Sequence, residues 1–303
     1  MNLTFKPVNP DHYRGLYPFH ANFLDRDGRN YHYVDEGAGD PVVMVHGNPT
    51  WSFFFRHLIH ALAPAYRCIA PDHMGCGLSD KPDDNQYGFR LKQRVSDFAA
   101  LMDHLELERV TLVVHDWGGM IALAWAIDNL HRISRLVVTN TTGFLPPDKK
   151  RIPWQLWFIR NMSILATPAV LHGNLFAGAA IHMAPYKRLS APVKKGLLAP
   201  YNCPRSRLAT LRFVQDIPLM LGDPGFAIAD RVDRHLSKLT KKPMLILWGR
   251  HDFVFDLDYY REWCRRFPGA ETHLFDDAGH YLLEDVPERI AGLIADFLSR
   301  HPA

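Results

Sequence analysis

The chain has 303 residues, of which 47% are hydrophobic and 22% charged, a composition typical of folded globular proteins. Its 35 basic and 32 acidic residues give a formal net charge of +3 and are spread along the chain, without the basic blocks that nucleic-acid binding usually requires. The N-terminus, MNLTFKPVNPDHYRGLYPFH, lacks the apolar stretch of a secretory signal, and no run has the length of a membrane span, so we expect a cytoplasmic protein without a transmembrane segment.

Short apolar runs rich in β-branched residues predict the strands of one sheet. The first two runs flank the turn DRDG and predict a hairpin over 19–24 and 30–34. Later strands are expected at 41–46, 66–71, 111–116, 133–140, 243–249 and 271–276. Helical periodicity occurs at 51–63, 89–105, 118–129, 257–266 and 287–300. Strands that are apolar on both faces and alternate with helices predict a mostly parallel, doubly wound α/β sheet.

This alternation is interrupted once. Residues 142–239 have helical periodicity, several prolines and many aromatic residues, but no convincing strand. The pattern predicts a helical cap over 142–239, inserted between two parts of an α/β core at 1–141 and 240–303.

The segment VVHDWGG places Asp116 at the end of a predicted strand. A sharp strand–turn–helix elbow requires small residues nearby, and Gly118 and Gly119 satisfy this, although Val114 occupies the position of the first glycine in G-x-S-x-G. A carboxylate at the elbow is already ionised and needs no base to activate it. We therefore predict that Asp116 is a nucleophile.

An ester formed on Asp116 must be cleaved by water. His280, in DAGHYLLED, follows the last predicted strand and is the expected general base, and Asp252, in WGRHDF, is expected to orient its ring. A single strand-end aspartate is more often a helix N-cap, and capping of the next helix is the alternative for Asp252. The order nucleophile, acid, histidine favours catalysis. His115 and Asp72 are interpreted as structural.

Four segments, HGNPTWSFFFR, PDHMGCGLSDKP, VVHDWGGMIA and DAGHYLLED, together resemble the haloalkane dehalogenase family of α/β-hydrolases. The similarity extends over nearly the whole chain and is weakest in the cap. It implies an α/β-hydrolase fold, a small apolar substrate and a halide ion bound by the side-chain N–H groups of Asn48 and Trp117. It also implies that the backbone N–H groups of these two residues are oxyanion donors. An anion leaving in an apolar cavity needs such preorganised donors.

Two departures bear on the reaction. Asn140 stands where some family members carry the acid, so the acid here is assigned to Asp252, and Asn140 is interpreted as either a neutral hydrogen-bond donor or a loop residue. The segments FVQDIPL, HDFVFD and GHYLLED resemble the branch that includes the β-lactone decarboxylases of long-chain olefin biosynthesis. In one reaction Asp116 displaces halide and water opens the alkyl ester; in the other it attacks a β-lactone, which loses carbon dioxide to form an alkene. The sequence places dehalogenation slightly ahead, because a halide fully explains two converging N–H donors.

Other functions are weaker alternatives. Epoxide hydrolysis would require a pair of tyrosines in the cap, and Tyr186 and Tyr201 are available there. A non-catalytic ligand-binding protein or scaffold is the alternative outside catalysis. Neither GxGxxG in a dinucleotide context nor HExxH is present, so we expect no metal, nucleotide or flavin cofactor. The aromatic segment 154–186 leaves open a homo-oligomer contact, an enzyme-assembly partner or a membrane surface.

Overall fold

The structure is a computed structural model that describes residues 6–147 and 150–303. Its described strands form one eight-stranded sheet in the order β1-β2-β4-β3-β5-β6-β7-β8. The two pairs β1–β2 and β2–β4 are antiparallel, and all other neighbours are parallel. The strands are β1 (Asn22–Asp25), β2 (Asn30–Glu36), β3 (Pro41–Val45), β4 (Arg67–Pro71), β5 (Val110–Asp116), β6 (Ile133–Thr141), β7 (Met244–Gly249) and β8 (Glu271–Phe275).

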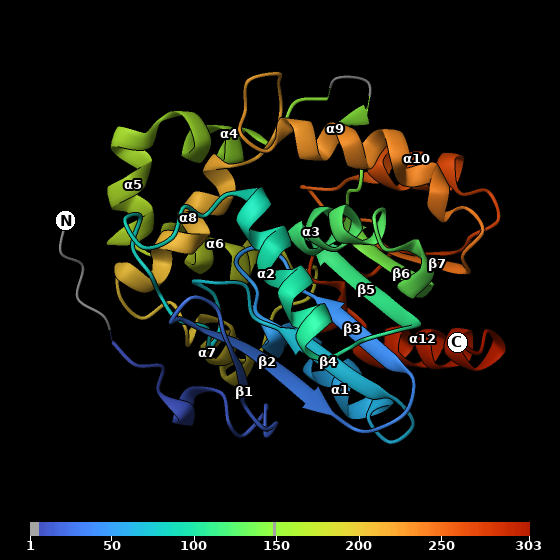
Figure 1. Ribbon diagram of the computed structural model, residues 1–303. Helices are drawn as coiled ribbons and strands as arrows, with labels where there is room; N and C mark the ends of the chain where they lie inside the picture. Colours follow the sequence, from blue (N-terminus) through green and yellow to red (C-terminus); the bar gives the residue numbers. More distant parts are fainter. Residues whose placement is uncertain (1–5, 148–149) are drawn as a thin grey trace.

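Helices cover both faces of this sheet (Figure 1). On one face α1 (Arg56–Leu62) packs against α12 (Pro287–Arg300), and on the other α3 (Trp117–Ala126) packs against α2 (Leu91–His104) and α9 (Phe226–His235). The remaining described helices of the core are α10 (Leu257–Arg266), α11 (Leu282–Asp285) and the short 3-10 helices Pro10–His12, Ser52–Phe55, Leu130–Arg132 and Leu236–Leu239.

The core has two hydrophobic clusters, one on each face of the sheet. In β5, Leu112 and Val114 belong to one cluster, and Val113, between them, belongs to the other. Successive side chains of a strand point to opposite faces, so a strand covered on both sides must be apolar throughout. This explains why the parallel strands were recognisable as continuous apolar runs.

The predicted strands and core helices are confirmed, with shifts at some ends. The first strand begins at Asn22, because Phe19 lies outside the ladder and packs its ring 5.0 Å from that of Tyr17. The helix expected over 51–63 is divided into a 3-10 turn, Ser52–Phe55, and α1.

Between β6 and β7 the regular secondary structure of the described residues is helical, apart from an isolated bridge between Leu221 and Asp223, and loops join the helices. Its further helices are α4 (Trp154–Asn161), α5 (Ser163–Leu171), α6 (Leu175–Met183), α7 (Ala191–Leu198), the 3-10 turn Arg205–Arg207 and α8 (Leu208–Gln215). Helices α4 to α8 gather at one end of the sheet (Figure 1). Because α9 packs on α3, the division at 142 and 239 stays a prediction.

In the described residues, no single helix combines the length and apolar character needed to cross a bilayer. The bent pair α5 and α6, at 77° to each other, passes that test only when the two are taken together.

Candidate active site

Asp116 is the last residue of β5 and is followed directly by α3. Its φ of 51° and ψ of −126° lie in a region that non-glycine residues rarely adopt, which is typical of a strained elbow. A Cβ on Gly118 would lie 1.9 Å from the carbonyl oxygen of Val45, and one on Gly119 would lie 1.9 Å from Oγ1 of Thr141. Both positions therefore need glycine for the elbow to pack against the sheet.

The two oxygens of the Asp116 carboxylate face different partners. Oδ1 accepts a 2.7 Å hydrogen bond from the backbone N–H of Asn48, and the backbone N–H of Trp117 also binds the carboxylate. Oδ2 lies 3.6 Å from Nε2 of His280. Burial raises the pKa of Asp116, although His280 and the two N–H groups act in the opposite direction. Oδ1 thus occupies the predicted oxyanion position, and Oδ2 faces the histidine.

His280 lies between the two carboxylates. Its Nδ1 is 2.7 Å from Oδ2 of Asp252, a buried hydrogen bond, while Nε2 faces Asp116. Burial disfavours the charged ring, but the charge and hydrogen bond of Asp252, with the charge of Asp116, outweigh it and raise the pKa of His280. The ring is therefore oriented to accept a proton at Nε2.

Asp252 is held from two sides. Its Oδ1 accepts hydrogen bonds from the backbone N–H groups of Val254 (2.7 Å) and Phe255 (3.0 Å). Its Oδ2 accepts from His280 and from Nδ2 of Asn140 at 2.7 Å. The N-cap of α10 is Asp256, so capping of that helix does not account for Asp252.

His115 and Asp72 make structural contacts, as the sequence predicts. His115 is buried, and its Nε2 lies 2.8 Å from the backbone oxygen of His280, which fixes that segment against β5. Asp72 is buried and accepts from the backbone N–H groups of Ser52 and Leu78. Asp72 thus braces its loop.

The side chains of Asn48 and Trp117 line the same cavity, but their N–H groups differ in availability. Nδ2 of Asn48 donates to the backbone oxygen of Thr210 at 3.0 Å, so one of its two N–H groups is already engaged. No residue in the described part of the chain accepts from the indole N–H of Trp117, whose ring packs 5.3 Å from that of Phe213. Of the two predicted donors in the described part of the chain, Trp117 therefore has the less engaged N–H group.

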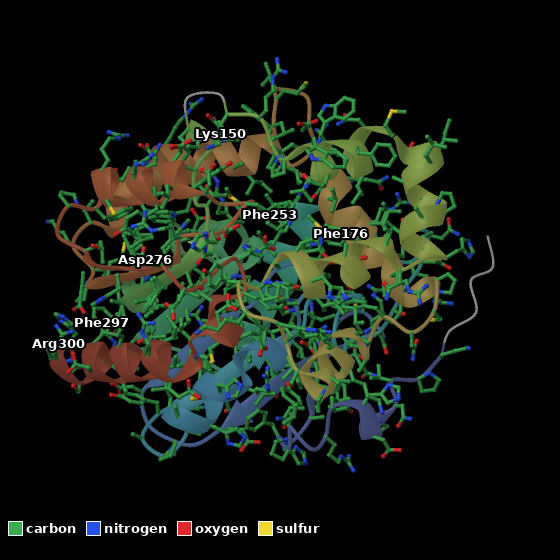
Figure 2. All side chains as sticks on the ribbon, turned by 180° about the vertical axis from the view of Figure 1, so that it is seen from behind. Lys150, Phe176, Phe253, Asp276, Phe297 and Arg300 are labelled. Carbon is green, nitrogen blue, oxygen red and sulfur yellow. The ribbon has the colours of Figure 1, made fainter. Side chains whose placement is uncertain are left out.

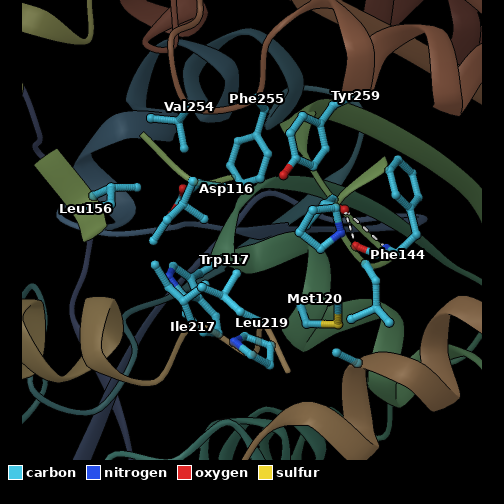
Figure 3. Close-up of a pocket in the computed structure, with 16 residues that line it drawn as sticks. Asp116, Trp117, Met120, Phe144, Leu156, Ile217, Leu219, Val254, Phe255 and Tyr259 are labelled. Atoms are coloured by element: carbon cyan, nitrogen blue, oxygen red, sulfur yellow. Dashed lines mark hydrogen bonds between the residues drawn. The ribbon is translucent and has the colours of Figure 1, made fainter. Parts of the chain in front are cut away.

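Two cavities meet at Asp116. One has a volume of about 370 Å³ and extends between α4 and α6; the other, shown in Figure 3, has a volume of about 100 Å³ and extends toward α9 and α10. Residues of both linings include Asp116, Trp117, Leu156, Ile217 and Val254. Most of the remaining lining is apolar.

Some of these residues could not be found from motifs. Leu156, Ile217 and Val254 are ordinary apolar residues. Ile217 and Val254 lie in the segments FVQDIPL and HDFVFD, which carry a family resemblance, but no motif assigns either residue to the cavities. The expected tyrosine pair does not form at Asp116: Tyr201 is buried with its hydroxyl 3.3 Å from the backbone oxygen of Thr50, and Tyr186 stacks on the ring of His251. Among the described tyrosines, Tyr259 and Tyr281 line the cavities instead.

Comparison with known proteins shows the family of the chain. Residues 40–287 match the family described as alpha/beta hydrolase fold. The chain is 46% identical to a cis-3-alkyl-4-alkyloxetan-2-one decarboxylase of Shewanella oneidensis, over 94% of this chain and 90% of that protein. It is 33% identical to haloalkane dehalogenase 2 of Mycobacterium bovis, over 98% of this chain and 99% of that protein. Among solved structures, a mutant of the haloalkane dehalogenase DatA from Agrobacterium tumefaciens superposes with a TM-score of 0.81 at 25% identity, covering 95% of this chain and 100% of that one.

Proposed function

The chain is an enzyme of the alpha/beta hydrolase fold family, in the group that contains haloalkane dehalogenases and β-lactone decarboxylases, and we propose that its substrate is a cis-3,4-dialkyl oxetan-2-one. The 46% identity to a decarboxylase of such lactones, against 33% to a dehalogenase, supports this order of the two reactions. It reverses the slight preference drawn from the sequence.

The observation that carries the proposal is the pair of cavities at Asp116. A dialkyl β-lactone has two hydrocarbon chains on neighbouring ring carbons. With its ring beside Asp116, one chain enters the cavity of about 370 Å³ and the other enters that of about 100 Å³. A simple haloalkane has one chain and leaves the second cavity unexplained. Apolar linings suit hydrocarbon chains, because burial of apolar surface drives binding.

The proposed chemistry uses the two oxygens of Asp116 differently. Oδ2 attacks the alkyl-bearing ring carbon next to the ring oxygen, not the carbonyl carbon. The bond between that carbon and the ring oxygen breaks, which gives an alkyl ester of Asp116 and a free carboxylate on the neighbouring carbon. The N–H groups of Asn48 and Trp117 stabilise the developing anion. Carbon dioxide then leaves, the electron pair of its C–C bond forms the alkene, and the carboxylate of Asp116 is released. No water is consumed.

Haloalkane dehalogenation is the second candidate, and the geometry of His280 favours it. The His280 ring, paired with Asp252 at 2.7 Å and 3.6 Å from Asp116, is arranged to activate a water that cleaves an ester. Oδ1 of Asp116 would become the oxyanion and is already bound by the backbone N–H of Asn48. The released anion would be a halide bound by Trp117.

The test compares the two substrates directly. The wild-type enzyme is incubated in parallel with a 1-bromoalkane and a cis-dialkyl β-lactone, and bromide and alkene are measured. We expect alkene release to exceed bromide release in kcat/KM. Bromide without any alkene would contradict the proposal.

Matched cavity variants sharpen this test. Ala229 lines only the smaller cavity, and Ala179 lines only the larger one. Ala229→Leu should raise KM for lactones with two long chains, and shortening one chain to methyl should restore turnover. Ala179→Leu should likewise raise KM, by limiting the length of the chain that enters the larger cavity. Equal effects of both variants on a one-chain bromoalkane and a two-chain lactone would argue against separate chain sites.

A further inference from the structure

The mouth of the larger cavity is surrounded by exposed apolar side chains. Trp154, Leu175, Met183 and Phe253 line this cavity and are also exposed at the surface, Trp154 to 73%. We call these four residues the cavity rim. In Figure 2, Phe253 and the neighbouring lining residue Phe176 lie on the side of the molecule that faces the reader. The route to Asp116 therefore opens through an apolar surface.

The apolar surface continues from the rim along α4 and α5. Trp157, Met162, Ile164 and Leu165 are exposed there, Ile164 to 89%. Helix α5 packs against both α4 and α6, so these residues adjoin the rim. Soluble monomers rarely expose contiguous apolar patches of this kind without a binding role.

The charged residues of the segment that includes α4 to α8 are all basic. Between residues 150 and 215 the sequence contains ten Lys and Arg and no Asp or Glu, which leaves 25 basic against 32 acidic residues in the rest of the chain. The overall charge of +3 therefore conceals a basic segment on an otherwise acidic protein. Arg151, Arg188, Lys194 and Lys195 make no ion pair with any residue that the structure describes.

The unpaired basic residues lie beside the apolar ones. Arg151 lines a surface groove together with Trp154 and Trp157. Arg188 and Lys194 line a second groove, which also includes Ile181 and His182 from the last turn of α6. Apolar residues, tryptophans and flanking cations are the combination that binds the interface of an anionic membrane.

We propose that the cavity rim and the adjoining faces of α4 and α5 bind the surface of an anionic lipid bilayer, from which the substrate enters the larger cavity. This rests on the proposed function in one respect, since a lactone with two alkyl chains partitions into membranes. The anionic headgroups face Arg151, Arg188 and Lys194, while Trp154 and Trp157 lie among the headgroups and upper acyl chains. A peripheral contact of this kind requires no membrane-spanning helix.

Co-sedimentation of the full chain with vesicles tests the binding. Vesicles of equal parts phosphatidylcholine and phosphatidylglycerol should bind the protein about tenfold more tightly than phosphatidylcholine alone. Binding to them should weaken at about 1 M salt, where charges are screened within about 3 Å. No binding to either kind of vesicle would overturn the proposal, and equal binding to both would overturn its electrostatic part.

Two double variants locate the surface. Trp157→Ser with Ile164→Ser removes apolar residues outside both cavities, and Arg188→Glu with Lys194→Glu reverses the charge. Each should lower vesicle affinity about tenfold or more, while Phe23→Ser on β1 and Lys92→Glu on α2 should leave it unchanged. Retained binding in both double variants would refute the assigned face. If the Ser variant instead converts a dimer to a monomer, the face binds a second copy and the proposal fails.

Activity measurements separate this proposal from the proposed function. The Trp157→Ser, Ile164→Ser variant should turn over a short-chain substrate dissolved in water as the wild type does, but should lose turnover of a long-chain lactone presented in vesicles. Vesicle binding without lactone turnover would support the surface and contradict the lactone as substrate. Lactone turnover without vesicle binding would support the lactone as substrate and contradict the membrane-binding surface.

Discussion

Nδ2 of Asn140 donates a 2.7 Å hydrogen bond to Oδ2 of Asp252, the same oxygen that accepts from Nδ1 of His280. Oδ1 of Asn140 accepts in turn from the backbone N–H of Gly249 at 2.9 Å. The amide therefore ties the end of β6 to the end of β7 and orients the acid toward the histidine. Asn140 is therefore a hydrogen-bond donor to the acid, one of the two interpretations that the sequence left open, and we predict that it positions Asp252.

Replacing Asn140 with alanine should affect both stability and ester cleavage. The change leaves the buried N–H of Gly249 without its partner and removes one donor from Asp252, so we expect a loss of about 1–3 kcal/mol in the free energy of unfolding. Urea denaturation measures this, and single-turnover kinetics should show slower ester cleavage with little change in ester formation. Asn129→Ala, which removes a hydrogen bond to Trp125 away from the site, is the control. Unaltered cleavage in Asn140→Ala would contradict a positioning role.

Replacement of His280 with phenylalanine should separate the two halves of the reaction on a bromoalkane. Attack by Asp116 needs no base, so about one equivalent of bromide should be released before the enzyme stalls with the alkyl mass added. Mass spectrometry of the intact protein detects the adduct, and peptide mapping should place it on Asp116. Asp116→Ala should give neither burst nor adduct. An adduct-free enzyme that still releases alkene from a lactone would confirm that decarboxylation does not pass through water activation.

The pH dependence follows from the raised pKa of His280. Only the neutral ring can accept a proton from water, so ester cleavage should be lost as pH falls through the pKa of His280, which the charge and hydrogen bond of Asp252 still raise in the ester. The charge of Asp252 is a main cause of the increase, and Asp252→Asn should move the midpoint to lower pH as well as slow cleavage. Stopped-flow measurement of ester cleavage across pH 5–9 tests both statements. Alkene release should lack this dependence, because decarboxylation consumes no water.

The indole N–H of Trp117 should accelerate ester formation, the first step of the reaction. Trp117→Phe keeps an aromatic ring against Phe213 but removes the donor, so ester formation should slow by about 10²–10³-fold, the effect of removing one such donor. The rate of the bromide burst measures this step. Trp125→Phe, on the same helix but outside both cavity linings, serves as the control. Equal burst rates for the two variants would show that the indole does not stabilise the leaving anion.

We expect activity to survive EDTA and exhaustive dialysis. An ionised carboxylate and N–H donors supply the nucleophile and the anion stabilisation without a cofactor. Turnover is compared before and after treatment, with and without added divalent metal. Activity that is lost and then restored by metal would count against the proposed mechanism.

The sequence by itself determined the fold and the order of the candidate catalytic residues. Parallel strands covered on both faces must be apolar throughout, so the ends of these strands could be located from the sequence. Asp116 and the loops that carry Asp252 and His280 lie at carboxyl-terminal strand ends, which are at the same edge of the sheet. Glycines after Asp116 were informative because a Cβ there would collide with β3 and β6.

Tertiary structure decided what those residues face. The amide of Asn48 donates to Thr210, which lies 162 residues away in the chain, so its partial engagement had no local signal. Likewise, Leu156, Ile217 and Val254 come from three separate segments and form the junction of two cavities only after these segments pack together. Tyr186 and Tyr201 both lie in loops of the segment predicted as the cap, yet one is exposed and the other buried. Cavity shape depends on contacts between distant residues, and periodicity and motifs report only on neighbours along the chain.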